Sequence, residues 1–180
     1  MCSNHNSGGG RRRRRGRRMA ALGPAFAAAS IGSPVLATEI DRNALADALD
    51  DEYRAEATYQ AVIDKFGPVR PFVNIIEAEK RHSSMVRRQY SRLGMSAPEN
   101  PYLGKVDAPA SLMEACAQGV EAEVENIALY DRLLPKISDP SVRQVLSRLQ
   151  AASRDNHLPA FKRCVARGGT PGRGPGRGSA

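Results

Sequence analysis

Residues 72–93 read FVNIIEAEKRHSSMVRRQYSRL, and this stretch decides the fold that the sequence predicts. Its apolar residues recur at the spacing of one helix face: Phe72, Ile75, Ile76, Val86, Tyr90 and Leu93. Glu79 lies on the same face, and His82 follows three positions later. An ionised carboxylate on a core-facing helix surface is unfavourable unless it is paired or binds a metal. The stretch therefore predicts an amphipathic helix that carries a Glu-x-x-His pair into a bundle.

Three further segments show the same pattern of an apolar helix face interrupted by acids or by a histidine. They span about residues 41–66, 111–134 and 140–165, with Ser111 as the expected N-cap of the middle one. The interrupting residues are Glu52, Glu56, Glu123 and His157. No strand pattern of comparable length occurs in the sequence. We therefore expect an all-α protein with four helices.

The connections between these helices predict the topology. Short turns follow the first and third helices, which makes two antiparallel hairpins. The second and third helices are joined by residues 94–109, which can extend over roughly 50 Å. That reach exceeds the ~36 Å length of a 24-residue helix. One long crossover between two hairpins is the ferritin-like variant of the four-helix bundle, and we expect this fold for residues 38–166.

The residues that interrupt the apolar faces have the chemistry of metal ligands. The i, i+3 spacing puts Glu79 and His82 on one helix face, while Glu52, Glu123 and His157 come from the other three helices. Oxygen and nitrogen donors without a thiolate suit iron or manganese better than structural zinc. We expect a di-iron carboxylate site, with manganese as the alternative metal. A buried polar network without metal is the other interpretation.

Five motifs carry a resemblance to a known family. They are Asp50-Asp51-Glu52-Tyr53-Arg54, FGPVRPFVNI at 66–75, Glu79-Lys80-Arg81-His82, Gly119-Val120-Glu121-Ala122-Glu123 and His157-Leu158-Pro159-Ala160-Phe161. Over about residues 41–166 the chain resembles the uncharacterised ferritin-like family of bacterial and archaeal proteins. The resemblance implies the ferritin-like bundle. It also implies the following metal ligands: Glu52, Glu79, His82, Glu123 and His157. It implies no particular reaction, because the activity of that family is not established.

One carboxylate is missing from this set. A symmetric site would have a second Glu-x-x-His on the fourth helix, but Arg154 stands three residues before His157. Two divalent metals carry a charge of +4, whereas the three proposed glutamates supply −3. Glu56, one turn beyond Glu52 on the same face, would supply the fourth negative charge, and its distance from the following turn places it level with Glu79. We rank Glu52 first and keep Glu56 as a candidate ligand.

Two tyrosines and two cysteines lie on the same helix faces. Tyr59 and Tyr130 are expected to pack in the core with a hydrogen-bonded hydroxyl, and a redox or proton-relay role is the alternative. Cys116 lies seven residues before Glu123, and Cys164 lies seven residues after His157. If the Glu and the His meet on antiparallel helices, the cysteines come level two turns away. We expect a disulfide if the protein is exported, with two buried thiols as the alternative.

Charge is distributed unevenly along the chain. The formal net charge is +8, but residues 1–37 hold seven arginines and residues 167–180 hold three, with no acid in either segment. The other 17 basic and 19 acidic residues leave the central part at 17 − 19 = −2. Nucleic-acid binding by the folded domain therefore has little electrostatic support, and we expect no nucleic-acid partner.

The two ends of the chain are expected to lie outside the fold. In residues 1–37, an arginine-rich stretch ends at Arg17-Arg18 and is followed by an uncharged segment and by Val35-Leu36-Ala37. This order is typical of a twin-arginine export signal, which predicts a periplasmic or cell-envelope protein. The alternative is an uncleaved basic leader on a cytoplasmic protein. The uncharged segment is too weakly apolar for a stable membrane span. The Gly-rich residues 167–180 are expected to form a flexible tail.

These observations lead to two functional hypotheses. The first is a ferritin-like di-iron protein with oxidase, ferroxidase or peroxidase activity on dioxygen or peroxide. The sequence has no Cys-x-x-Cys pair for a rubrerythrin-like electron-transfer module, and iron storage would require a homo-oligomer. The second hypothesis is a non-catalytic metal-binding or structural helical module of the cell envelope. The missing carboxylate on the fourth helix favours this second interpretation.

Overall fold

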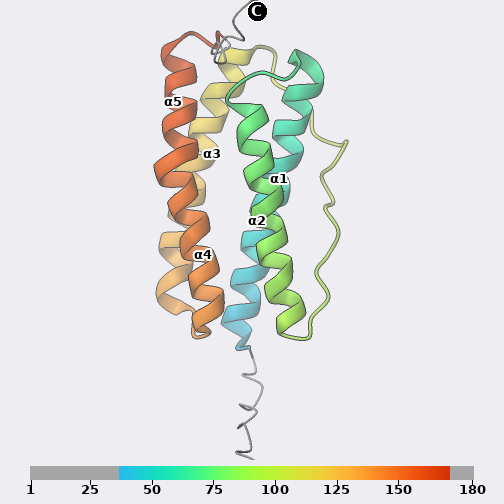
Figure 1. Ribbon diagram of the computed structural model, residues 1–180, viewed down its shortest axis with the longest axis vertical. Helices are drawn as coiled ribbons and strands as arrows, with labels where there is room; N and C mark the ends of the chain where they lie inside the picture. Colours follow the sequence, from blue (N-terminus) through green and yellow to red (C-terminus); the bar gives the residue numbers. More distant parts are fainter. Residues whose placement is uncertain (1–36, 171–180) are drawn as a thin grey trace, which may run out of the picture. The chain divides into compact units, whose positions relative to one another are not determined.

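The computed structural model describes residues 37–170, which form helices and connections without a strand (Figure 1). There are three uninterrupted long helices, α1 (Glu39–Phe66), α2 (Phe72–Arg92) and α3 (Leu112–Leu133). A fourth long segment follows the short 3₁₀ helix η1 (Leu134–Lys136) and consists of α4 (Pro140–Ala152), η2 (Ser153–His157) and α5 (Leu158–Ala166). The all-α prediction is confirmed. Most of the predicted export signal (residues 1–36) and the end of the predicted tail (residues 171–180) lie outside the described residues.

The four long segments pack as two antiparallel hairpins (Figure 1). One hairpin is made of α1 and α2, and the other is made of α3 and the fourth segment. A long connection, residues 93–111, runs beside the bundle from the end of α2 to the start of α3. Helices α2 and α3 each contact both α1 and α4. None of the described helices is long and apolar enough to cross a membrane.

Two apolar clusters fill the bundle, and a polar layer separates them. One cluster includes Leu45, Leu49, Val86, Leu146 and Leu149. The other includes Val62, Phe72, Ile76, Cys116 and Phe161. Between them lie four ionisable side chains whose residues are at most 4% exposed, namely Glu52, Glu79, Glu123 and His157. Because apolar layers on both sides exclude water, these groups have to find partners within the protein.

The fourth segment differs from the continuous helix that the sequence predicts. Residues 153–157 form a π-turn, in which the Leu158 N–H bonds to the carbonyl of Ser153, five residues earlier. Pro159 is the physical reason, because proline has no N–H and its ring clashes with the carbonyl four residues back in a regular α-helix. The wider turn leaves both Ser153 and His157 buried. Such π-turns often occur at functional sites.

A disulfide joins the two hairpin partners α3 and α5, and this confirms the sequence-based prediction. The Cα atoms of Cys116 and Cys164 are 5.9 Å apart, within the usual range for a disulfide. Next to this bond Gly119 allows α3 and α5 to approach closely, since a Cβ at this position would lie 2.6 Å from the Phe161 ring. The Phe161 ring in turn packs against Tyr59, with ring centroids 5.3 Å apart. The disulfide and these contacts fix α3 and α5 next to His157.

Asp41 connects the start of α1 to the loop before α4. Its carboxylate accepts hydrogen bonds from Thr38 Oγ1 (2.7 Å), Ser138 N (2.8 Å) and Asp139 N (3.1 Å). The Asp41 carboxylate also accepts the Thr38 N–H (3.1 Å), and Thr38 Oγ1 accepts the Asp41 N–H in return, which completes a capping box. Burial alone would raise the pKa of Asp41, but these hydrogen bonds lower it below its usual value. The capping box also explains why α1 begins before the predicted start at Asp41.

Replacing Asp41 by alanine should destabilise the protein by about 2–4 kcal/mol, because several hydrogen bonds to a buried charged group are lost together. Equilibrium unfolding in urea measures this difference. Asp47→Ala removes an exposed carboxylate from the same helix and should change the free energy of unfolding by no more than about 0.5 kcal/mol. Equal effects of the two substitutions would contradict the anchoring role of Asp41.

Candidate metal centre

Three carboxylates and two imidazoles from all four long segments meet in the polar layer. They form two groups, and in each group the ligand-type atoms all lie within 4.8 Å of one another. The His82 group consists of Glu52, Glu79 and His82. The His157 group consists of Glu79, Glu123 and His157. Glu79 belongs to both groups, so its two carboxylate oxygens link them.

The carboxylate of Glu79 lies between the two imidazoles. Its Oε2 is 3.0 Å from His82 Nδ1, and its Oε1 is 3.1 Å from His157 Nδ1. The outer carboxylates complete the groups: Glu52 Oε2 is 3.2 Å from His82 Nδ1, and Glu123 Oε1 is 3.5 Å from His157 Nδ1. The two imidazole rings are stacked, with centroids 5.6 Å apart. The arrangement brings together all five ligands that the family resemblance implies.

Two buried tyrosines orient the outer carboxylates in a reciprocal way. Tyr130 of α3 donates a hydrogen bond to Glu52 Oε1 of α1 (3.0 Å), and Tyr59 of α1 donates one to Glu123 Oε1 of α3 (3.1 Å). Each tyrosine follows the glutamate of its own helix by seven residues. Burial raises the pKa of both hydroxyls well above the usual value of 10, so they remain protonated donors. Both tyrosines are therefore hydrogen-bonded core residues, as expected.

The charges of the two groups are strongly coupled. Burial alone would lower the pKa of the imidazoles, but the adjacent carboxylates raise it to about 9 for His82 and about 10 for His157. Burial alone would raise the pKa of Glu79, but His157 and His82 lower it to about 2. Burial raises the pKa of Glu52 well above its usual value. In the metal-free protein, both imidazoles therefore carry a proton at neutral pH and pair with the ionised Glu79.

One buried nitrogen of the centre has no hydrogen bond. His157 Nδ1 is inaccessible to solvent and has no hydrogen-bond partner among the described residues. Glu79 Oε1 and Glu123 Oε1 are the nearby acceptor atoms, but neither makes a hydrogen bond of acceptable geometry with it. The contacts of His157 Nδ1 with these two carboxylates are therefore ion pairs without hydrogen-bond geometry.

Glu56 is not part of the centre. It is half-buried and lines a surface groove of α1 and α2 together with Lys80 and Arg87. Four residues turn an α-helix by about 400°, so Glu56 lies about 40° around α1 from Glu52 and faces the groove. The level of Glu56 along the bundle, which made it a candidate ligand, does not take account of this rotation. The structure therefore brings Glu52, and not Glu56, into the two groups.

Arg154, which occupies the position where a symmetric site would have its fourth carboxylate, also faces away from the centre. Arg154 is exposed and pairs with the neighbouring Asp155, with Nε 2.9 Å from Oδ1. The buried residue at this level is instead Ser153, whose hydroxyl donates a hydrogen bond to Asn126 Oδ1 (2.8 Å). The fourth segment therefore contributes a hydroxyl and one imidazole to the polar layer.

Asp51, Asn126 and Ser153 form a polar chain beside the centre that was not predicted from the sequence. The side-chain amide of Asn126 donates a hydrogen bond from Nδ2 to Asp51 Oδ2 and accepts one at Oδ1 from the Ser153 hydroxyl. The pKa of Asp51 is raised to about 6, mainly by burial and further by the negative charges of Glu123 and Glu79. The hydrogen bond from Asn126 acts in the opposite direction and lowers this pKa. One signal was present, because Asn126 lies three residues after Glu123 and therefore on the same helix face.

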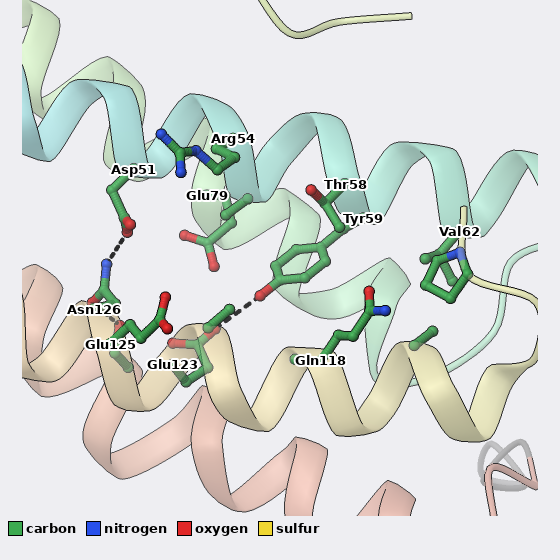
Figure 2. Close-up of a pocket in the computed structure, with 16 residues that line it drawn as sticks. Asp51, Arg54, Thr58, Tyr59, Val62, Glu79, Gln118, Glu123, Glu125 and Asn126 are labelled. Carbon is green, nitrogen blue, oxygen red and sulfur yellow. Dashed lines mark hydrogen bonds between the residues drawn. The ribbon is translucent and has the colours of Figure 1, made fainter. Parts of the chain in front are cut away.

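A pocket of about 230 Å³ opens between α1 and α3 and reaches the His157 group (Figure 2). Glu79 and Glu123 line it, together with Tyr59, Asp51 and Asn126. The space exists because small residues face it from both helices, namely Ala55, Ala115, Gly119 and Ala122. Glu52, His82 and His157 are not among the lining residues. The pocket therefore reaches the centre at Glu79, which both groups share, and at Glu123 of the His157 group.

Comparisons with known proteins identify one similar fold and indicate no activity. No protein-family model matches the chain, and no curated protein matches it significantly. The chain is similar to the crystal structure of a hypothetical protein from Methanococcus jannaschii DSM 2661, with a TM-score of 0.67 and 21% sequence identity. The alignment covers 78% of this chain and 87% of that chain. At this level of identity the similarity shows the fold alone.

The free energy of unfolding of the metal-free protein should fall as the pH rises from about 6.5 to about 10. Both imidazoles titrate at higher pH in the folded state, with pKa values of about 9 and 10, than the ~6.5 of an unfolded chain. Their stabilisation is therefore complete below about pH 6.5 and is lost as the pH rises through the folded values. The decrease should reach about 1.4 kcal/mol per pH unit for each imidazole.

Urea unfolding at several pH values after removal of metals by a chelator measures this dependence. His157→Gln should reduce the slope, because one of the two raised pKa values is removed. A free energy of unfolding that stays constant between about pH 6.5 and 9 would show that the imidazoles are not held protonated.

Proposed function

We propose that this protein is a ferritin-like metal-binding protein that holds two metal ions, with iron as the preferred metal. The observation that carries the proposal is the position of Glu79, which is shared by two groups of two glutamates and one histidine. Ferritin-like di-metal proteins bind their ions with inward-facing glutamates and Glu-x-x-His pairs. The two helical hairpins and their long connection support the same assignment.

The donor set is suited to iron. Both groups offer carboxylate oxygens and one imidazole nitrogen, and neither contains a thiolate. Such donors suit iron and manganese. The buried His157 Nδ1 supports the assignment further, because it makes no hydrogen bond among the described residues and would be available to a cation between Glu79, Glu123 and His157.

The side chains around the groups would bind and orient the ions. Tyr130 holds Glu52 by Oε1 and leaves Oε2 directed toward His82, while Tyr59 restrains Glu123. The apolar clusters on both sides exclude bulk water. The imidazoles would release their protons when a metal ion binds, because only the neutral ring is a ligand. A pair of ferrous ions would supply the electrons for an oxidase, ferroxidase or peroxidase reaction with dioxygen or peroxide.

A non-catalytic metal-binding module is the second candidate. Arg154 leaves the two groups with three carboxylates, a charge of −3 against the +4 of two divalent ions. A single ion, or a purely structural one, would need fewer carboxylates. This candidate differs from the first in metal content and in reactivity with oxygen.

We also propose that the protein is exported to the periplasm or cell envelope. The Cys116–Cys164 disulfide supports this location, because disulfides persist mainly in oxidising compartments. The predicted signal lies in the arginine-rich residues 1–37, and twin-arginine signals direct proteins to export.

Metal analysis of purified protein reconstituted anaerobically with ferrous iron tests the proposal. We expect about two irons per chain and an optical band that changes on exposure to oxygen. Glu79→Gln should lower the iron content of both positions, because this residue is shared. Glu77→Gln, which changes an exposed acid of the same helix, should leave about two irons bound.

The competing outcomes are distinct. One zinc ion per chain, or a fully folded protein without metal, would support the non-catalytic module. Retention of both irons by Glu79→Gln would contradict the shared role of this carboxylate.

A further inference from the structure

A metal ion has to cross the protein surface to reach the centre. Glu52, Glu79, Glu123 and His157 are each at most 4% exposed. The pocket between α1 and α3 is lined by Glu79 and Glu123, so it connects solvent with two of the three residues of the His157 group (Figure 2). The small side chains on its walls leave room for a hydrated ion or its ligands.

The charge of this pocket favours cations. Four acids line it, namely Asp51, Glu79, Glu123 and Glu125. Arg54 is the one base among its lining residues. The Arg54 guanidinium pairs with Asp50 at 2.7 Å and lies over the Tyr102 ring, 5.4 Å from its centroid. A cleft lined mainly by one sign of charge raises the local concentration of the opposite ion.

Asp51 is oriented for contact with an incoming ion. Its Oδ2 accepts a hydrogen bond from Asn126, and Ser153 fixes the Asn126 amide from the other side. Its Oδ1 has no hydrogen-bond partner among the described residues. In Figure 2, Asp51 projects from α1 toward Asn126 of α3, beside Glu79 and Glu123. A pre-oriented carboxylate with one free oxygen is a suitable ligand for a divalent cation.

The helical bundle can pack without the polar chain of Asp51, Asn126 and Ser153. The two hairpins are related by a repeat in which Glu52, Tyr59 and His82 correspond to Glu123, Tyr130 and His157. The first and third helices are related by an offset of 123 − 52 = 71 residues, and the second and fourth by an offset of 157 − 82 = 75 residues. With these offsets, Asp51 corresponds to Ala122, Asn126 to Ala55 and Ser153 to Ala78. Alanines therefore fill the equivalent places in the other half, and the polar residues need a separate explanation.

An independent observation points to a cation at the inner end of this pocket. The side chain of His157 is only 5% exposed, and its Nδ1 has no hydrogen-bond partner among the residues that the structure describes. This nitrogen is directed at Glu79 and Glu123, the two acids at the inner end of the pocket.

We propose that the pocket between α1 and α3 is the route by which divalent cations reach the centre, and that Asp51 is the first carboxylate to bind them. From Asp51 the ion passes to Glu79, Glu123 and His157. The inference rests on the proposed function, because it assumes that the two groups bind metal.

Stopped-flow measurement of cobalt(II) uptake by the metal-free protein tests this route, with the visible absorption of bound cobalt as the signal. Asp51→Asn retains the size of the side chain and should slow uptake by about tenfold or more, since clefts of one charge raise association rates by such factors. Asp47→Asn removes the same charge from an exposed position one turn earlier and should stay within about twofold of the wild type. The final amount of bound cobalt should be similar in all three proteins.

A second variant tests the route without changing charge. Ala122 is exposed on α3 at the pocket wall, and Ala122→Phe should slow uptake by narrowing the opening. Circular dichroism confirms that each variant is folded. Wild-type uptake rates in either Asp51→Asn or Ala122→Phe would overturn the proposed route. A wild-type protein that binds no cobalt or iron would instead contradict the proposed function.

Discussion

The structure depends on the burial of one carboxylate, that of Glu79, between two imidazoles at the centre of a helical bundle. An ionised carboxylate in such a place is unfavourable unless each oxygen has a partner. His82 from the same helix supplies one partner, and His157 from the fourth segment supplies the other. These contacts constrain α2 and η2 at the same level, and the two outer glutamates then lie beside the imidazoles.

Several other features of the bundle serve this arrangement. The π-turn before Pro159 accommodates the proline and leaves His157 buried in the polar layer. Tyr59 and Tyr130 hold the outer glutamates from the opposite helices. The disulfide and the close packing at Gly119 fix α3 against α5. The result is a polar layer that is rigidly enclosed by two apolar clusters and is approached by the pocket between α1 and α3.

The helices and most of the centre could be predicted from the sequence because their signals are local or periodic. The apolar spacing of residues 72–93 located α2, and the seven-residue offsets of Cys116 and Cys164 predicted their disulfide. The missed features depend on tertiary contacts. Glu56 was kept as a ligand because position along the bundle was considered without rotation around α1. Asp51 was overlooked because its importance arises from Asn126 and Ser153, which are distant in sequence.

The central claim is that Glu79 links two metal ions. Crystals of the protein loaded anaerobically with iron, measured with X-rays on either side of the iron absorption edge, test it most directly. We predict two anomalous peaks, one between Glu52, Glu79 and His82 and the other between Glu79, Glu123 and His157. The absence of iron from both groups, or a single peak that does not contact Glu79, would contradict the claim.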